Sequence, residues 1–326
     1  MIGTNHKLSI IVPTKDHPDD LRRLLLSLSA QTVFPDEVIV VDGGSNPVEA
    51  VVREKWPFVT AYERVYPPWL AKQQNAGIRR VSRLSTLVAF VDDDIVLAHD
   101  ALVAMISFWG QADKDVGGAA FNLINNTGRP RYVWLKSLFG MDSKTRGILL
   151  RSGYNTKIGA VDQTTEVQWL YSGATVWRRE ILDVFHFDEW FEGPGHIYEV
   201  EFCFRIGERY RMVVVANARA EEISPTRSWN DQLLGRWQIL NRLYFVYKHR
   251  GKRGLSLALC WLALTCQFLV NLSRAVFDMD RRYLRRAIGN GTGFIDALRM
   301  LFGSAQNIAP CNSFLNSSVH RNDPKL

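Results

Sequence analysis

The first half of the chain alternates short apolar runs with segments whose apolar residues recur at helical spacing. The expected strands are residues 8–13, 37–42 and 85–91. The expected helices are residues 19–31, 71–84 and 99–109. Such alternation is typical of a largely parallel sheet with helices on both faces, so we predict an α/β fold.

The pattern weakens between Asn125 and Val167, where Gly, Arg, Lys and Thr are frequent. We expect this segment to pass over the ligand site as an irregular excursion. Regular patterns return at Val167, and they predict a helix over 198–210 followed by a strand over 211–216. A helix over 232–249 is expected to close the compact domain.

A different composition begins at Lys248. Residues 254–273 carry no charge and approach the ~20 residues needed to span a bilayer. Small and polar residues recur every three or four positions from Ser256 to Asp278, as in an amphipathic helix with a broad apolar face. Basic residues flank both ends, which favours a helix lying in the interface of an anionic leaflet. A spanning helix and a buried or dimer-forming helix stay open as alternatives.

The domains expected from these patterns are a compact domain over 1–250, a basic and apolar membrane-associating helical region over 251–303, and a polar tail over 304–326. The net charge of +7 among 326 residues suits an anionic partner such as a nucleotide or an acidic lipid, and no nucleic-acid partner is expected. The four cysteines have no metal-binding spacing, and the first residues lack the apolar core of a secretory signal. We therefore expect a reduced, cytosol-facing protein.

The stretch "AFVDDDIVL" at residues 89–97 places three carboxylates directly after a strand. Ligands of open α/β sheets bind beyond the carboxyl ends of strands, and Thr14 and Asp42 lie at two further such ends. Adjacent carboxylates suit a hard divalent cation such as Mg²⁺ or Mn²⁺. A solvated acidic turn that caps the next helix is the alternative, because short acidic motifs also occur by chance.

Several motifs together resemble family 2 glycosyltransferases with the GT-A fold. They are "LSIIVPTKDHPDDLRRLLLSLSAQTVFPDEVIVVDGGSN", "QQNAGI", "LVAFVDDD", "WLYSGATVWRREIL", "FDEWFEG" and "YEVEFCFRI". They follow the family's order over about residues 7–250, and the ordered set is more specific than any one motif. The resemblance implies a GT-A nucleotide-diphospho-sugar transferase fold with a C-terminal helical extension.

The resemblance also implies a place for the nucleotide. Pro13 and Thr14 match the end of the first strand, where the base packs. Asp42 matches the aspartate that binds a pyrimidine base, although a turn residue before two glycines would look the same. The family's Arg-Asn pair near the donor corresponds to a segment in which glutamine replaces the arginine, namely Lys72, Gln74 and Asn75.

Asp92 and Asp94 match the two ends of the family's DxD motif, and Asp93 is its variable and most dispensable position. The resemblance assigns the metal to Asp94 and the ribose or metal to Asp92. Glu222 stands where related enzymes often carry a histidine that completes the metal site, and a surface acid is its alternative. Arg227 is expected to pair with the diphosphate.

Glu199 occupies the position of the family's catalytic aspartate, opening a helix. It is expected to be the general base, with a structural helix-terminal charge as the alternative. Glu201, two residues later, is expected to be structural. The acceptor side corresponds to Trp169, Ser172 and Gly173, although Trp169 fits a core position slightly better.

These inferences predict a metal-dependent, inverting glycosyltransferase at the cytoplasmic membrane face. It would move sugar from a nucleoside-diphosphate donor to a lipid-linked or cell-surface glycan. "QLLGRW" has one residue more than the motif of processive synthases, so a single transfer is expected and Arg236 and Trp237 are expected to pack as ordinary helix residues. Three departures from the family motifs leave open a degenerate scaffold that binds nucleotide-sugars. Nucleotidyl transfer is disfavoured because "VPTKDHPDD" has no glycine.

Overall fold

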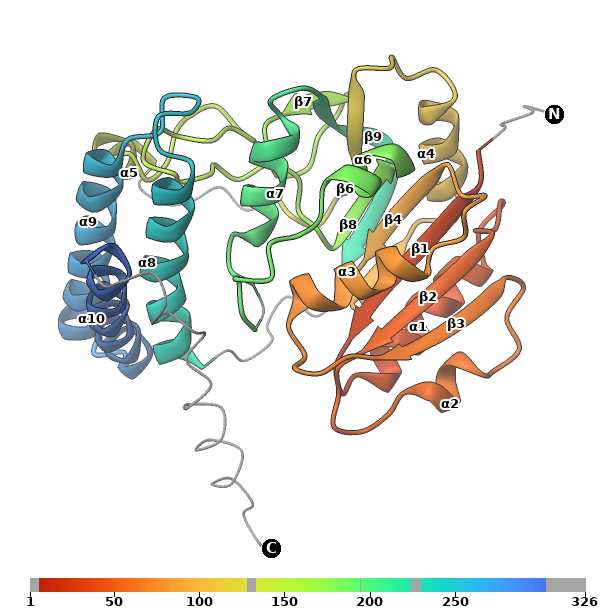
Figure 1. The fold of residues 1–326 in the computed structure, drawn as a ribbon, viewed down its shortest axis with the longest axis horizontal. Helices are drawn as coiled ribbons and strands as arrows, with labels where there is room; N and C mark the ends of the chain where they lie inside the picture. Colours follow the sequence, from red (N-terminus) through yellow and green to blue (C-terminus); the bar gives the residue numbers. More distant parts are fainter. Residues whose placement is uncertain (1–5, 128–132, 194, 224–229, 303–326) are drawn as a thin grey trace, which may run out of the picture.

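The computed structural model describes residues 6–127, 133–193, 195–223 and 230–302. The chain builds one mixed sheet in the order β3-β2-β1-β4-β8-β6-β9-β5, with β7 beside β9 (Figure 1). The first four of these strands pair in parallel. They are β1 (Leu8–Thr14), β2 (Glu37–Asp42), β3 (Val59–Arg64) and β4 (Leu87–Val91).

The second half of the sheet is mixed. Strand β8 pairs antiparallel with both β4 and β6, and β9 pairs parallel with β6. The remaining strands, β5 and β7, both pair antiparallel with β9. The bounds are β5 (Ile95–Leu97), β6 (Val116–Leu123), β7 (Thr165–Val167), β8 (Ala174–Arg178) and β9 (Arg211–Glu222). The antiparallel pairing of β5 with β9 brings the end of β9 beside the start of β5, directly after the loop that follows β4.

Each face of the sheet is covered by helices, because the central strands are buried on both sides. In β1, Ile10 and Val12 belong to the apolar core under one face, whereas Ile11 belongs to the core under the other. This alternation is the period of two that a strand imposes. The flanking helices are α1 (Pro18–Ser29), α2 (Glu49–Val52), α3 (Leu70–Arg80), α4 (Ala101–Trp109), α6 (Arg179–Val184) and α7 (Tyr198–Ile206).

The expected strands and helices of the first half are all present, with shifted ends. Helix α3 ends at Arg80, and α7 ends before Gly207, so both are shorter than predicted. Strand β9 continues to Glu222, six residues beyond the predicted end, because residues 219–222 pair with β6 and β5. Among its described residues, the excursion after β6 contains one short helix, α5 (Val133–Leu138), and strand β7.

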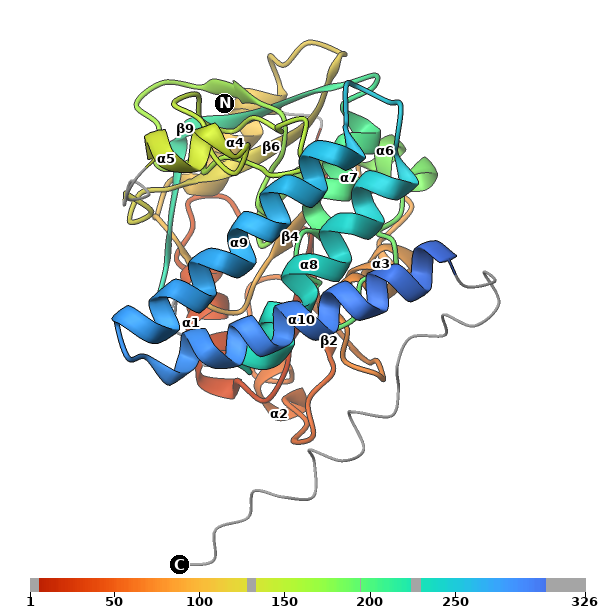
Figure 2. The same cartoon turned by 90° about the vertical axis from the view of Figure 1, so that its left-hand side faces the viewer.

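Three helices form a layer at one end of the molecule: α8 (Asp231–Lys248), α9 (Leu257–Phe277) and α10 (Arg281–Phe302) (Figure 2). Glycines allow α8 and α10 to approach closely. A Cβ at Gly235 would overlap the backbone of Arg286, and a Cβ at Gly289 would overlap the backbone of Gln232. The expected boundary at residue 250 therefore falls between helices that pack against one another.

Candidate active site

A cavity of about 830 Å³ opens at the carboxyl ends of β1 and β4. The start of α7, the loop before β8 and the end of β9 complete its walls. This position is where an open α/β sheet usually binds its ligand. Eight of the residues predicted from the sequence line it: Pro13, Thr14, Asp92, Asp93, Asp94, Ser172, Glu199 and Glu222.

Asp92 is positioned by the pairing of β4 with β8. Its backbone N–H donates to the carbonyl of Gly173 at 2.8 Å, one step beyond the last strand pair, Val91 with Ala174. A Cβ at Gly173 would overlap the Asp92 carboxylate. Gly173, predicted on the acceptor side, therefore makes room for the Asp92 carboxylate.

Asp93 is buried and hydrogen-bonded, although the sequence indicated that it was the most dispensable of the three. The Thr14 hydroxyl donates to its Oδ2 at 2.6 Å, and the Nδ1 of His17 lies 3.4 Å from the same oxygen. These contacts join β1 and the start of α1 to the acidic loop. We therefore expect substitution of Asp93 to affect the loop's structure.

Asp94 and Glu222 are brought together by β5 and β9. Ile95 is the register partner of Glu222, and the N–H of Ile223 donates to the Asp94 carbonyl at 2.9 Å. The pairing therefore brings the two residues to the same cavity although they are far apart in the sequence. This strand pairing had no signal in the local pattern.

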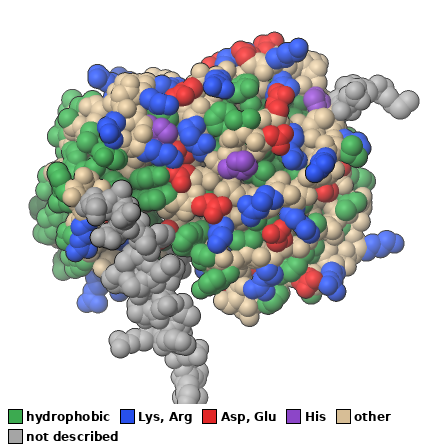
Figure 3. All heavy atoms as spheres, in the orientation of Figure 1, with side chains coloured by type: hydrophobic (Ala, Val, Ile, Leu, Met, Phe, Trp, Pro, Cys, Tyr) green, Lys and Arg blue, Asp and Glu red, His purple; other side chains and the backbone are tan. Residues whose placement is uncertain are grey.

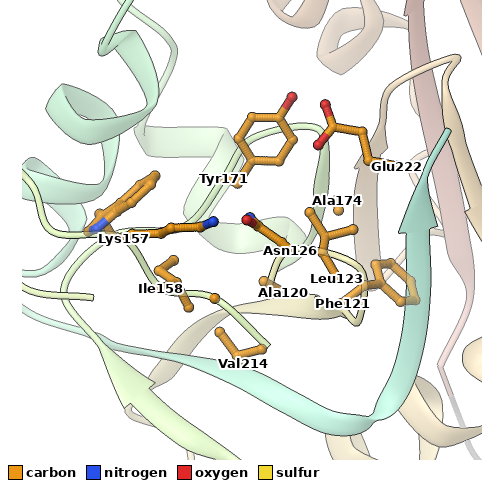
Figure 4. Close-up of a pocket in the computed structure, with 12 residues that line it drawn as sticks. Ala120, Phe121, Leu123, Asn126, Lys157, Ile158, Tyr171, Ala174, Val214 and Glu222 are labelled. Atoms are coloured by element: carbon orange, nitrogen blue, oxygen red, sulfur yellow. The ribbon is translucent and has the colours of Figure 1, made fainter. Parts of the chain in front are cut away.

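Tyr171 lies between the cavity and a smaller pocket of about 90 Å³ that also contains Lys157 and Asn126 (Figure 4). Its hydroxyl points toward the Glu222 carboxylate in Figure 4 and lies 3.5 Å from Asp92 Oδ2. Burial raises the pKa of Tyr171, and the nearby carboxylates, Asp92 first, raise it further. The cavity is therefore strongly electronegative at this point. Tyr171 was not predicted, because a single tyrosine in an apolar segment has no distinctive pattern.

Glu199 lies in the first turn of α7 and lines the cavity. The residue before the helix turn, Ile197, has a left-handed backbone with φ of 65°, which directs the chain from the preceding loop into α7. Burial raises the pKa of Glu199 to about 7, although a hydrogen bond from its own backbone and the charge of Arg242 act in the opposite direction. A carboxylate with a pKa near neutrality is well matched to general base catalysis.

Arg242 of α8 is a buried cation that sequence reasoning missed. One of its Nη atoms donates to the carbonyl of Gly153, and its guanidinium lies 3.9 Å from the centre of the Tyr154 ring. Its other close electrostatic neighbours include Glu199 and His196. Burial and the charge of Arg242 lower the pKa of His196 to about 3, so that this cavity residue is neutral.

The predicted donor residues of α3 do not line the cavity in the part of the chain that the structure describes. The Lys72 ammonium donates to the Tyr66 carbonyl at 3.1 Å. The Asn75 side chain bonds both backbone groups of Phe187. Gln74 is fully buried, and its amide has no hydrogen-bond partner among the described residues.

Asp42 and Trp169 also lie outside the lining of the large cavity as described. Asp42 is fully buried at the end of β2 and accepts hydrogen bonds from the N–H groups of Gly44 and Val48 and from the Tyr62 hydroxyl. These donors are the pattern of a turn-stabilising carboxylate. The Trp169 indole donates to the Thr156 carbonyl and lines the smaller pocket.

The remaining predicted residues have structural contacts or are not described. The Ser172 hydroxyl lies 2.5 Å from the Tyr198 hydroxyl, which joins the loop before β8 to α7. Arg236 pairs with Asp296 of α10 at 2.6 Å, and Trp237 packs near Gly193, in line with ordinary helix packing. Arg227, predicted to bind the diphosphate, lies outside the described residues.

The chemistry of the cavity fits a hard divalent cation. Asp92, Asp94 and Glu222 offer carboxylate oxygens, which are the ligands that Mg²⁺ and Mn²⁺ prefer. Within the described ranges, no three His, Cys, Asp or Glu side chains converge closely enough to form a metal site by themselves. An ion there would need further oxygen ligands, which a diphosphate can supply.

The sequence matches the model of the family described as "Glycosyl transferase family 2" over residues 9–185. The O-antigen biosynthesis protein RfbC of Myxococcus xanthus is 28% identical over 229 residues. That match covers 65% of this chain and 17% of RfbC, so the chain spans less than a fifth of that relative's length.

Solved structures share the fold at low sequence identity. The mannosyltransferase PcManGT from Pyrobaculum calidifontis, in complex with GDP-Man and Mn²⁺, has a TM-score of 0.52 and 16% identity. The match covers 91% of this chain and 87% of PcManGT. Residues 1–349 of S. aureus TarS in complex with UDP-GlcNAc give a TM-score of 0.54 and 17% identity, covering 89% and 81% of the two chains. These likenesses show the fold predicted from the sequence.

Proposed function

Because this chain belongs to glycosyl transferase family 2, we propose that it transfers a sugar from a nucleoside diphosphate to the hydroxyl of a lipid-linked or cell-surface glycan. The observation that carries this proposal is one cavity lined by both the acidic residues 92–94 and Glu199. The acidic side suits a metal-bound diphosphate, and Glu199 suits an acceptor hydroxyl. The proposed transfer is a single displacement assisted by one base. Because the acceptor attacks from the face opposite the leaving diphosphate, the anomeric configuration is inverted.

Glu199 acts as the general base in this mechanism. The acceptor hydroxyl attacks the anomeric carbon from the face opposite the diphosphate and gives its proton to the Glu199 carboxylate, as the sugar–phosphate bond breaks. Partial burial of Glu199 excludes water and strengthens the hydrogen bond to the hydroxyl. A general base contributes about 10²–10⁴-fold to such a reaction.

Asp92, Asp94 and Glu222 would hold a divalent cation, Mg²⁺ or Mn²⁺. When bound, such a cation neutralises the charge that develops on the leaving diphosphate. The PcManGT and TarS complexes contain GDP-Man with Mn²⁺ and UDP-GlcNAc, respectively, which supports a nucleotide-sugar donor here. A pyrimidine nucleotide is proposed, with Pro13 and Thr14 beside its base.

The acceptor is proposed from the curated relative, whose name assigns it to O-antigen biosynthesis. A glycan on a lipid carrier would place the reaction at the cytoplasmic face of the membrane. A single transfer per encounter is proposed, because Arg236 is paired with Asp296.

The proposal is tested by screening nucleotide-sugars for release of nucleoside diphosphate with Mn²⁺, Mg²⁺ or chelator. Asp94→Asn is expected to lower metal-dependent turnover by about 10²-fold or more, because a neutral amide is a weaker ligand for a hard cation. Asp100→Asn is the matched control, since Asp100 is half-exposed before α4 and lies outside the cavity as described.

Full metal-dependent turnover by Asp94→Asn would contradict the metal role. Binding of uridine or thymidine diphosphate without turnover of any donor would favour the nucleotide-sugar-binding scaffold. Calorimetry on the same samples, with and without Mn²⁺, separates these outcomes.

A further inference from the structure

The helical end of the molecule exposes a large number of apolar side chains, which together form an extended apolar face. Within the described residues, 13 of the 24 exposed large apolar side chains lie between Leu257 and Phe302. Figure 3 shows hydrophobic side chains gathered along the left margin, where α9 lies in Figure 1. Extended patches of this kind on soluble proteins mark interaction sites. We call this the outer apolar face: Leu259, Leu262, Leu269, Val270, Leu272, Val276, Phe277, Met279, Leu284, Ile288, Ile295, Leu298 and Phe302.

The face results from the way each helix is rotated. On α10 the exposed residues Leu284, Ile288, Ile295 and Leu298 follow helical spacing along one side, whereas Gly289 and its buried neighbours face α8. On α9, most of the small and polar stripe predicted from the sequence faces inward, whereas Arg274 and Asp278 at its end are exposed.

The inward stripe is held by specific contacts. Cys260 and Ala263 are fully buried, and Asn271 donates to Asn290 of α10 at 2.7 Å. Asn290 in turn donates to the Gly235 carbonyl of α8 at 2.7 Å. Because this side of α9 is fixed to protein, lipid would not surround the helix as it surrounds an isolated span. The 21-residue helix α9 is long and apolar enough to cross a membrane by length and composition alone. The packing instead favours a helix that lies along a surface.

The charge around the face is strongly positive. Residues 250–302 contain nine Lys and Arg against three Asp, a net charge of +6 out of the chain's +7. Arg281 and Arg285 are exposed at the start of α10 and have no carboxylate partner among the described residues. Two copies of this face would repel each other, whereas an anionic lipid surface would attract it.

We propose that α9 and α10 together form a membrane-docking platform, with the outer apolar face lying in the headgroup region of an anionic leaflet. Figure 2 looks onto this face, where the two helices form a V joined at residues 278–280. The apolar side chains enter the acyl boundary, and the arginines pair with lipid phosphates. This platform requires both helices, whereas the sequence indicated one.

The test measures partitioning of the full-length protein onto vesicles of phosphatidylcholine alone and of phosphatidylcholine with 30% phosphatidylglycerol (about one lipid in three, enough for a negative surface potential). Binding to the anionic vesicles is expected, weakening with salt. Ile288→Gln with Ile295→Gln is expected to lower partitioning by more than about tenfold, because two apolar side chains lose their burial. Arg281→Gln with Arg285→Gln is expected to lower it by about tenfold on anionic vesicles only.

The control is Leu84→Gln with Val184→Gln, which removes two exposed apolar side chains from another part of the surface. It is expected to leave partitioning unchanged, and thermal unfolding of each variant checks that it is folded. Equal binding by all variants, or none by the native chain, would overturn the platform. So would a dimer in sedimentation that the Ile288 and Ile295 changes dissociate while vesicles are not bound.

The vesicle measurement uses neither donor nor metal and can be repeated with Asp94→Asn. A failure of the platform is therefore separate from a failure of the proposed transferase reaction. Conversely, an inactive protein that binds anionic vesicles would leave the platform intact.

Discussion

The Glu199 carboxylate must be ionised to accept a proton, and its pKa is raised to about 7 by burial. Below that pH the protonated fraction increases, so the transfer rate is expected to fall about tenfold per pH unit. Above about pH 7 the rate should level off. A pH profile of kcat checks this expectation.

Glu199→Gln is expected to lower kcat by about 10²–10⁴-fold. It is also expected to abolish the acid limb of the kcat profile, which is the fall in rate below about pH 7. Glu180→Gln is the control, because Glu180 also lies in the first turn of a helix but is exposed. An unchanged profile for Glu199→Gln would show that Glu199 serves only the helix terminus.

Arg242 lowers the pKa of Glu199 through its buried charge, so its removal should raise that pKa. Arg242→Met is therefore expected to move the limb of the kcat profile to higher pH and to reduce turnover several-fold at pH 7. Arg242→Lys keeps the charge and is expected to leave the limb close to its native position. A limb that does not move in Arg242→Met would rule out this influence.

At the residue scale, sequence reasoning located the acidic loop, Glu199 and Glu222, which strand ends and motif order indicate. It did not find Tyr171 or Arg242, because each lies in an apolar segment and acquires its neighbours only in the folded chain. For Asp42 the strand-end argument gave the correct edge of the sheet. The side chain there is saturated by local donors, which a sequence does not reveal.

The element that carries Glu199 is fixed to α8 by a buried charge cluster. Glu201 is fully buried and contacts Arg205, Lys248 and His249 at 2.8–3.0 Å. Burial alone would raise the pKa of Glu201, but the hydrogen bond from His249 and the two nearby cations lower it to about 2. The sequence indicated a structural role for Glu201, and these contacts agree with it.

Glu201→Gln is expected to reduce the free energy of unfolding by about 3–5 kcal/mol, because buried cations lose their partner. Since the folded pKa lies below the ordinary carboxyl value, the native stabilisation is present above about pH 4.5 and is lost toward pH 2. Urea unfolding between pH 2 and 7 measures both effects. Glu208→Gln, which breaks the exposed pair with Lys252, is expected to change stability by less than about 1 kcal/mol.

The contact of α8 with α10 depends on glycine. Gly289→Ala is expected to destabilise the protein by about 1–3 kcal/mol, because the added methyl group overlaps the α8 backbone. Gly291→Ala is a matched control on the same helix, since nothing lies within 4 Å of its Cβ. There the change should stabilise α10 by up to about 1 kcal/mol through helix propensity. Thermal unfolding of the two variants compares them, and equal effects would contradict the close approach.

Among elements, the buried strands β1, β2 and β4 were predicted because continuous apolar runs are distinctive. The buried strands β6 and β8 were not predicted, because β6 contains two glycines and an asparagine and β8 is only five residues long. Strand β3 was missed, since it lies at the sheet edge and has a mostly half-exposed pattern. The full length of β9 was missed because polar and apolar residues alternate beyond Ala216, where pairing with β5 decides the structure.

At the scale of the whole molecule, the sequence predicted a GT-A sheet with a helical extension, and the comparisons confirm that fold. The rotation of α9 was not predictable from its composition, because an amphipathic pattern does not say which side meets protein. The side of α9 that meets protein is decided by α8 and α10. Asn290 of α10 accepts a hydrogen bond from Asn271 in the small and polar stripe, and glycines allow α8 and α10 to pack closely. Tertiary partners thus decide which side of α9 is buried.

Consecutive residues of α8 belong to two environments: Leu234 is part of the cavity wall, and Gly235 touches α10. A helix is about 10 Å across, so this arrangement sets a fixed height between the docking surface and the reaction centre. With the proposed platform resting on lipid, the reaction centre would be held at a fixed distance from the bilayer. For the proposed lipid-linked acceptor, this height would select substrates by the distance of the reactive hydroxyl from the bilayer, and a saccharide that had grown past it would no longer present its terminal sugar.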